Sequence, residues 1–124
     1  MKICITAEEK TLDSKVDPRF GRCQNFIFFD TDSGEFAVQE NINAQFQGGA
    51  GIQSAQLVSS KGVAAVLTGN VGPNAFETLN KAKIEIYTNV SGSVKEAIEE
   101  YKNGKLKVTQ GPSVTSKFGI ASSL

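Results

Sequence analysis

The 124-residue sequence contains no histidine and no tryptophan, and it has only two cysteines and three prolines. Without an imidazole the chain cannot build a Ser-His-Asp triad, a Cys-His pair or an HExxH zinc site. Two cysteines in a chain that we expect to be cytoplasmic are better explained as thiols than as a disulfide. These absences exclude the histidine-dependent hydrolases and every metal centre that is ligated by imidazole.

An excess of charge of one sign is also lacking. The chain has 13 lysines and arginines and 13 aspartates and glutamates, so its formal net charge is zero. A neutral chain has no excess positive charge for a nucleic-acid backbone or an anionic membrane. No apolar run approaches the ~18–20 residues that cross a bilayer, and the N-terminal apolar run is too short for a signal peptide. We therefore expect a cytoplasmic protein with no nucleic-acid and no membrane partner.

The length and composition favour one globular domain. A chain of 124 residues that is 40% hydrophobic and 21% charged can bury a real core without disulfides. We expect the domain to span residues 1–110. Residues 111–124 are rich in serine, threonine and glycine, which predicts a loosely ordered C-terminal tail with Phe118 and Ile120 as its candidate docking side chains.

The hydrophobic pattern predicts five strands and three helices. The expected strands are residues 2–6, 25–30, 35–40, 63–67 and 84–87. The three helices follow the third, fourth and fifth strands: residues 50–60, a segment that starts at Pro73, and a segment that begins with a Ser93–Glu96 capping box and ends at Asn103-Gly104.

The connections between these elements predict an α/β fold. A turn at residues 31–34, with Gly34 supplying a positive φ, makes the second and third strands an antiparallel hairpin. Right-handed crossovers through the helices place the fourth and fifth strands parallel to the first. The predicted architecture is a five-stranded mixed sheet in the order 3-2-1-4-5 with helices on its faces.

This topology brings three helix N-termini and the loop of residues 7–24 to one edge of the sheet, where open α/β sheets usually bind ligands. Helix N-termini present unpaired N–H groups and partial positive charge. The first two helices have no acidic residue in their opening turns, whereas the third is partly satisfied by its own Ser93 and Glu96. The only two arginines of the chain, Arg19 and Arg22, lie in the same loop. The sequence therefore predicts an anion site at this edge.

The candidate anion-binding residues come from the arginine-bearing loop and the two glycine-rich helix starts. They are Arg19, Phe20, Gly21, Arg22, Gly48, Gly49, Gly51, Gly72, Pro73 and Asn74. All of them except Phe20 have a structural alternative: the glycines can serve turns and packing, Pro73 and Asn74 can simply start a helix, and the arginines can pair with Asp13 or Asp17. No P-loop motif is present.

The two cysteines differ in their predicted surroundings. Cys4 lies inside the first strand and is expected to be a core thiol. Cys23 lies at a loop-to-strand junction beside Arg22, where a cation favours the thiolate. We therefore expect Cys23 to be the accessible thiol, with a lowered pKa, and the candidate metal ligand. The alternative is that Cys23 is a small buried residue.

Four motifs resemble the dinitrogenase iron–molybdenum cofactor biosynthesis family, which includes NifX- and NafY-type proteins and the C-terminal domain of NifB. The motifs are DPRFGRC-x-x-F, GGAGIQ-x-A, G-x-x-GPNAF-x-x-L and SGSVKEAIEEYKNGKL, and the resemblance covers roughly residues 1–107. It implies a three-layer ribonuclease H-like fold. It also implies binding of a metal–sulfur cofactor or its precursors without catalysis, with cofactor assembly or acceptor proteins as partners.

An anionic cluster would suit the predicted edge, because N–H groups and arginines can hold its sulfides and a thiolate can ligate a metal. One cysteine cannot supply the four thiolates of an ordinary iron–sulfur site. We therefore expect a preassembled iron–molybdenum or other metal–sulfur cluster, held mainly without covalent bonds. The alternative function is a nucleotide- or phosphate-binding regulatory module that uses the same edge. Nuclease activity is not expected, because the strands KICIT and VAAVL carry no carboxylate for metal ions.

Overall fold

The computed structural model describes residues 1–45 and 48–113, and their strands form one mixed sheet. The strands are β1 (Lys2–Ala7), β2 (Asn25–Asp30), β3 (Phe36–Glu40), β4 (Ala65–Leu67) and β5 (Glu85–Tyr87). Their order is β3-β2-β1-β4-β5, with β1 antiparallel to β2 and parallel to β4. The predicted order and directions are confirmed. The range of β2 is as predicted, and the other four strands differ from their predicted ranges by one or two residues at one end.

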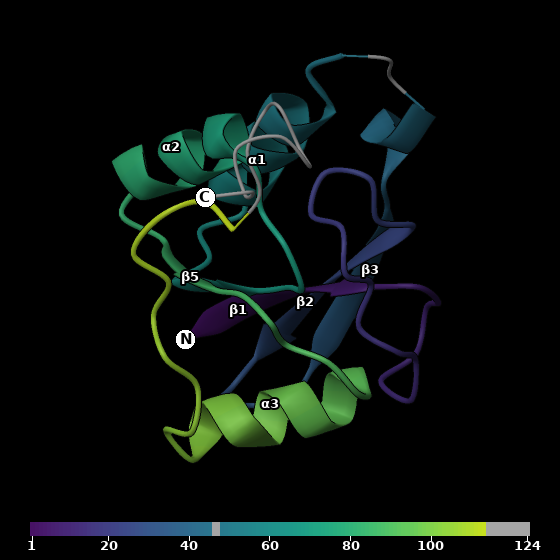
Figure 1. Ribbon diagram of the computed structural model, residues 1–124. Coiled ribbons are helices and arrows are strands. Elements are labelled where there is room, and N and C mark those ends of the chain that lie inside the picture. Colours follow the sequence, from purple (N-terminus) through teal and green to yellow (C-terminus); the bar gives the residue numbers. More distant parts are fainter. Residues whose placement is uncertain (46–47, 114–124) are drawn as a thin grey trace.

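Three α-helices complete the layers: α1 (Ala50–Ser60), α2 (Pro73–Lys81) and α3 (Val94–Lys102). Figure 1 shows α1 and α2 on one face of the sheet and α3 on the other. The α/β class with helices on both faces is therefore confirmed. None of the helices in the described ranges is long and apolar enough to span a membrane.

A short 3₁₀-helix, η1 (Ile42–Gln45), stands where the sequence predicted an amide-rich loop. The side chain of Asn41 explains this difference. Its Oδ1 accepts a hydrogen bond from the N–H of Asn43 at 3.0 Å, and its main-chain oxygen accepts one from Ala44 at 3.3 Å. An asparagine that bonds the backbone two residues ahead starts a tight turn.

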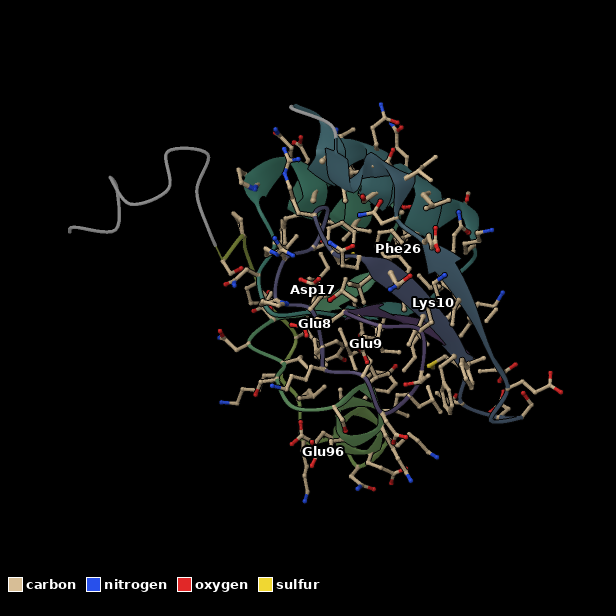
Figure 2. The ribbon with its side chains drawn as sticks, turned by 90° about the vertical axis from the view of Figure 1, so that its right-hand side faces the viewer. Glu8, Glu9, Lys10, Asp17, Phe26 and Glu96 are labelled. Carbon is tan, nitrogen blue, oxygen red and sulfur yellow. The ribbon has the colours of Figure 1, made fainter. Side chains whose placement is uncertain are left out.

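The sheet separates two hydrophobic cores. One core, under α1 and α2, is built from residues that include Cys4, Phe26, Val66 and Leu79. The other, against α3, includes Ile3, Ile5, Leu67, Val94 and Ile98. Successive residues of β1 point to opposite faces, and both faces are covered, so Ile3, Cys4 and Ile5 are all fully buried. In Figure 2, Phe26 lies on the α1–α2 side and Glu96 on the α3 side.

After α3 the chain returns across the edge of the sheet toward α2. The N–H of Thr109 donates to the oxygen of Ile86 at 2.7 Å, beside β5. Further along, Ser113 forms hydrogen bonds with Val71, directly before α2. Figure 1 shows this segment in yellow as it passes β5. Phe118 and Ile120, the candidate docking side chains of the tail, lie outside the described residues.

Candidate functional site

The arginine-bearing loop is attached to the end of β4 by main-chain hydrogen bonds. The N–H of Asn70 donates to the oxygen of Pro18 at 2.7 Å, and the N–H of Phe20 donates to the oxygen of Asn70 at 3.1 Å. A Cβ at Gly69 would stand 2.5 Å from the Cα of Pro18, which no real side chain tolerates. Glycine at residue 69 therefore lets the loop cross directly over the carboxyl end of β4.

Asp17 holds the same loop from inside. Its side chain is 1% exposed, and its carboxylate accepts hydrogen bonds from the main-chain N–H groups of Arg19 at 3.1 Å and Gln24 at 3.2 Å. The guanidinium of Arg19 forms an ion pair with it at 3.3 Å, and this contact raises the pKa of Arg19. Figure 2 shows Asp17 at the level of the sheet, between the helix layers. One of the alternatives that the sequence left open, pairing of an arginine with Asp17, is therefore realised by Arg19.

Two glycines bring the loop and the starts of α1 and α2 together. Gly21 has a φ of +94°, and a Cβ there would stand 2.9 Å from the Cα of Gly51. A Cβ at Gly51 would stand 3.3 Å from the Cβ of Ala75 in α2. Close packing, the structural alternative for these two glycines, is therefore part of their role. It also places three backbone segments around one point.

The first turns of α1 and α2 leave N–H groups without intrahelical partners. Gly49 caps α1 in the left-handed conformation, and Gly72 caps α2, which starts with Pro73. Neither cap residue has a side chain that accepts a hydrogen bond, and neither first turn contains an acidic residue. Both helix starts therefore keep donors and partial positive charge that could face an anion.

The main-chain N–H groups at the start of α3, by contrast, already donate hydrogen bonds to other residues of the protein. The predicted capping box is present: Ser93 accepts from the N–H of Glu96, and Glu96 accepts from the N–H of Ser93. The N–H of Val94 donates to the oxygen of Ser14 at 2.8 Å, and the N–H of Lys95 donates to the oxygen of Leu12 at 2.9 Å. These bonds use the donors of its first turn, so α3 is not a third binding element.

A hollow of about 430 Å³ opens between the loop and the two free helix starts, and we call it the edge hollow. It is lined by Phe20, Arg22, Gly49, Ala50, Gly51, Ile52, Gly72, Pro73, Asn74 and Ala75. The guanidinium of Arg22 donates to the oxygen of Ala44 in η1 at 3.0 Å. Among the described residues, this lining contains one cation and no carboxylate, and the volume is in the range of ordinary small-ligand sites.

Besides Arg22, six of the predicted site residues line the edge hollow: Phe20, Gly49, Gly51, Gly72, Pro73 and Asn74. The other three, Arg19, Gly21 and Gly48, do not line it. Gly21 packs against the backbone of Gly51, outside the lining of the hollow. Arg19 is turned to Asp17, and Gly48 is exposed with open space around it. Ala50, Ile52 and Ala75 also line the edge hollow and were not predicted from the sequence. Their signal was present, because each directly adjoins a predicted glycine, proline or asparagine in a helix start.

Cys23 is not the accessible thiol that we expected. Its side chain is fully buried, in the core under α1 and α2, and the Nδ2 of Asn41 donates to its Sγ at 3.8 Å. Burial raises the pKa of Cys23 to about 12, with a further contribution from the negative charge of Asp17. The expected lowering fails because the chain buries this thiol instead of exposing it to solvent beside Arg22. A ligand role for Cys23 stays a prediction, and it requires this part of the core to open.

Among the described residues, the acidic and sulfur side chains do not gather into a separate metal centre. Within residues 1–45 and 48–113, no group of three or more aspartate, glutamate, cysteine or histidine residues is placed to hold a metal ion. Cys4 is buried as predicted, and its pKa is raised well above the usual value by desolvation. The edge can therefore offer hydrogen bonds and positive charge, and it offers few metal ligands.

Comparison with known proteins finds matches in both sequence and fold. A family model described as dinitrogenase iron-molybdenum cofactor matches residues 1–104. The apo form of the orange protein (ORP) from Desulfovibrio gigas superposes with a TM-score of 0.87 and 34% identity, over 90% of this chain and 94% of that one. A Thermotoga protein, TM1290, has a TM-score of 0.76 and 40% identity, over 86% and 91%. The uncharacterized protein MJ0580 of Methanocaldococcus jannaschii is 30% identical over 110 residues, which is 86% of this chain and 90% of its own.

Proposed function

Because this chain belongs to the dinitrogenase iron-molybdenum cofactor family, we propose that it binds and carries an anionic metal–sulfur cofactor or precursor, without catalysing a reaction. The observation that supports this proposal most directly is the edge hollow. Two helix starts without a capping side chain and Arg22 surround it, and none of the described residues that line it carries a carboxylate. A neutral protein therefore presents a local site of positive character that suits an anion.

The lining residues indicate how such a cargo would be held. The N–H groups of the first turns of α1 and α2 would donate to sulfide or oxide atoms on its surface. Arg22 would add a charged donor, and the side chain of Phe20 would supply an apolar wall. Since both cysteines are buried, the cargo would arrive with its own sulfide ligands and stay bound by hydrogen bonds and charge.

The proposal also concerns partners. A carrier has to receive its cargo from an assembly protein and release it to an acceptor, and noncovalent binding at a surface edge permits both steps. The edge hollow lies among loops and helix starts at one end of the sheet, where another protein can reach it without unfolding the sheet.

Anaerobic expression with added iron and molybdate, followed by elemental analysis and visible absorption of the purified protein, tests the function. We expect metal and acid-labile sulfide to copurify in a fixed ratio to protein. Apo protein would then be titrated with tetrathiomolybdate, a simple anion of metal and sulfide, and separately with phosphate and ATP. If no metal or sulfide is retained, and only phosphate or ATP shifts the melting temperature, the regulatory module is the correct function and the carrier proposal fails.

A further inference from the structure

A second hollow lies where the start of β2 and the end of β3 meet the loop after β1. It measures about 270 Å³, and none of its described lining residues lines the edge hollow. We call it the amide hollow, and it is lined by Glu8, Lys10, Gln24, Asn25, Glu40 and Asn41. Figure 2 shows Glu8 and Lys10 near the level of the sheet. Two of these six residues are acidic and one is basic, so the described lining has a net negative charge.

Asn25, the first residue of β2, brings an unsatisfied polar atom to this hollow. The residue is 5% exposed, and its Oδ1 is buried without a hydrogen-bond partner. Among the described residues it is the one buried side-chain nitrogen or oxygen in this state. Because nearly all buried polar groups of folded proteins are paired, this oxygen indicates a donor or a cation that the described chain does not supply.

The contacts of Asn25 fix the direction in which this oxygen points. On the side where β2 pairs with β1, the Nδ2 of Asn25 donates to the main-chain oxygen of Glu8 at 3.3 Å. The nitrogen and oxygen of an amide lie on opposite sides of its carbon, so Oδ1 points toward β3. The reversed amide would place Oδ1 against the oxygen of Glu8, which is also an acceptor.

Glu40 of β3 lies directly opposite Asn25 in the register of β2 and β3. Side chains of directly opposed residues lie on the same face, with Cβ atoms about 4.5–5.5 Å apart. The Oδ1 of Asn25 and the carboxylate of Glu40 are therefore neighbouring acceptors. One oxygen of this carboxylate pairs with the ammonium of Lys10, a side chain that is 59% exposed. Because water can hydrate so exposed an ammonium, another cation can take its place.

From this geometry we propose that the amide hollow binds a hydrated divalent cation of the Mn²⁺ or Ca²⁺ type, with the Oδ1 of Asn25 and the carboxylate of Glu40 as ligands. Amide and carboxylate oxygens are the ligands that these cations prefer, and water fills the remaining positions. Glu8 adds a second negative charge to the lining. The incoming ion displaces the ammonium of Lys10 from Glu40. This site is independent of the cofactor cargo proposed for the edge hollow.

Manganese titration of the full-length protein tests the site, because the electron paramagnetic resonance signal of free Mn²⁺ falls as the ion binds. We expect one bound ion with a dissociation constant of about 1 mM, the weak end of the range for oxygen sites. Glu40→Gln should weaken binding about tenfold, since it removes a charged ligand. Lys10→Gln should tighten binding about two- to fivefold, since it removes the competing ammonium. Glu9→Gln is the matched control: Glu9 does not line the hollow, so its loss should leave the affinity unchanged.

A second readout locates the ion. In NMR spectra, Mn²⁺ should broaden the side-chain amide signals of Asn25 and Gln24 and spare those of Gln56 on α1. Broadening that spares Asn25 would place the ion elsewhere and overturn the proposal. Equal losses of affinity in Glu40→Gln and Glu9→Gln would overturn it too, because only general charge would then matter. If no ion binds up to about 10 mM Mn²⁺, a water molecule alone completes Asn25 and the cation site is wrong.

Discussion

Gly21 and Gly51 lie so close that a single carbon added to Gly21 would stand 2.9 Å from the Cα of Gly51. The contact joins a loop that follows β1 to the first turn of α1, across about thirty residues of sequence. Because the backbone fixes the position of a Cβ and the other atom is a backbone Cα, turning a side chain cannot relieve this distance. The shape of the edge hollow is therefore set by main-chain packing.

This contact gives a first prediction. Gly21→Ala should lower the free energy of unfolding by about 1–3 kcal/mol, because it adds a clash with Gly51 and places alanine at a positive φ. Gly48→Ala is the matched control: a Cβ there meets nothing within 4 Å, and its expected change is within about 0.5 kcal/mol. Urea unfolding of the two variants measures both values. Equal stabilities would show that the loop adapts freely.

The two arginines should differ in their effect on binding. Arg22 lines the edge hollow, so Arg22→Gln is expected to weaken tetrathiomolybdate binding by about tenfold, the loss of a charged donor. Arg19 is paired with Asp17, and it does not line the hollow, so Arg19→Gln should change affinity by about twofold or less. Titration of the wild type and both variants with tetrathiomolybdate measures the two changes in affinity. A larger loss for Arg19→Gln would place the anion outside the edge hollow.

Both cysteines should resist alkylation in the folded protein. Cys4 and Cys23 are fully buried, so iodoacetamide should modify neither until urea unfolds the chain. Cys23→Ser should destabilise the protein by about 1–3 kcal/mol, because it buries a hydroxyl in an apolar core. Mass spectrometry of the alkylated protein and urea unfolding of the variant check these two outcomes. Fast modification of Cys23 alone would contradict its burial and support the accessible thiol that the sequence predicts.

Alkaline pH should destabilise the protein through the same thiol. The pKa of Cys23 is raised from 9.0 to about 12, so below pH 9 the thiol is protonated in both the folded and the unfolded chain. Between these values only the unfolded chain loses the proton, and stability falls by up to about 1.4 kcal/mol per pH unit. Cys23→Ala should therefore show a shallower decline between pH 9 and 10.5 in urea unfolding. Parallel declines in wild type and variant would contradict the buried thiol.

The strand order could be predicted from the sequence because each step used a local signal with one outcome. Gly34 at the tight turn forces a hairpin, and each crossover helix forces a parallel return. The capping box of Ser93 and Glu96 located the start of α3 to the residue. Element ends were less certain, since the ends of short strands depend on tertiary hydrogen bonds.

The site was harder to predict, and Cys23 shows why. From the sequence, Cys23 has an arginine as its neighbour, and that neighbour favours the thiolate. In the fold, the backbone turns so that Arg22 faces the edge hollow and Cys23 faces the core. The positive φ of Gly21 and the hydrogen bonds of the Asp17 carboxylate determine which of these two adjacent side chains points inward. No local sequence pattern predicts either feature.

The central position of β1 has a consequence for how the protein is made. This strand precedes the other four in the chain, and during synthesis it can pair with β2 as soon as residue 30 has emerged. Its other edge, however, waits for β4, which ends at Leu67. During that interval β1, whose residues Ile3, Cys4 and Ile5 are fully buried in the folded protein, presents an open row of main-chain donors and acceptors, the kind of edge to which foreign strands add. This edge of β1 therefore stays open to aggregation until the next 37 residues, from the end of β2 to the end of β4, have been synthesised and β4 has paired with it.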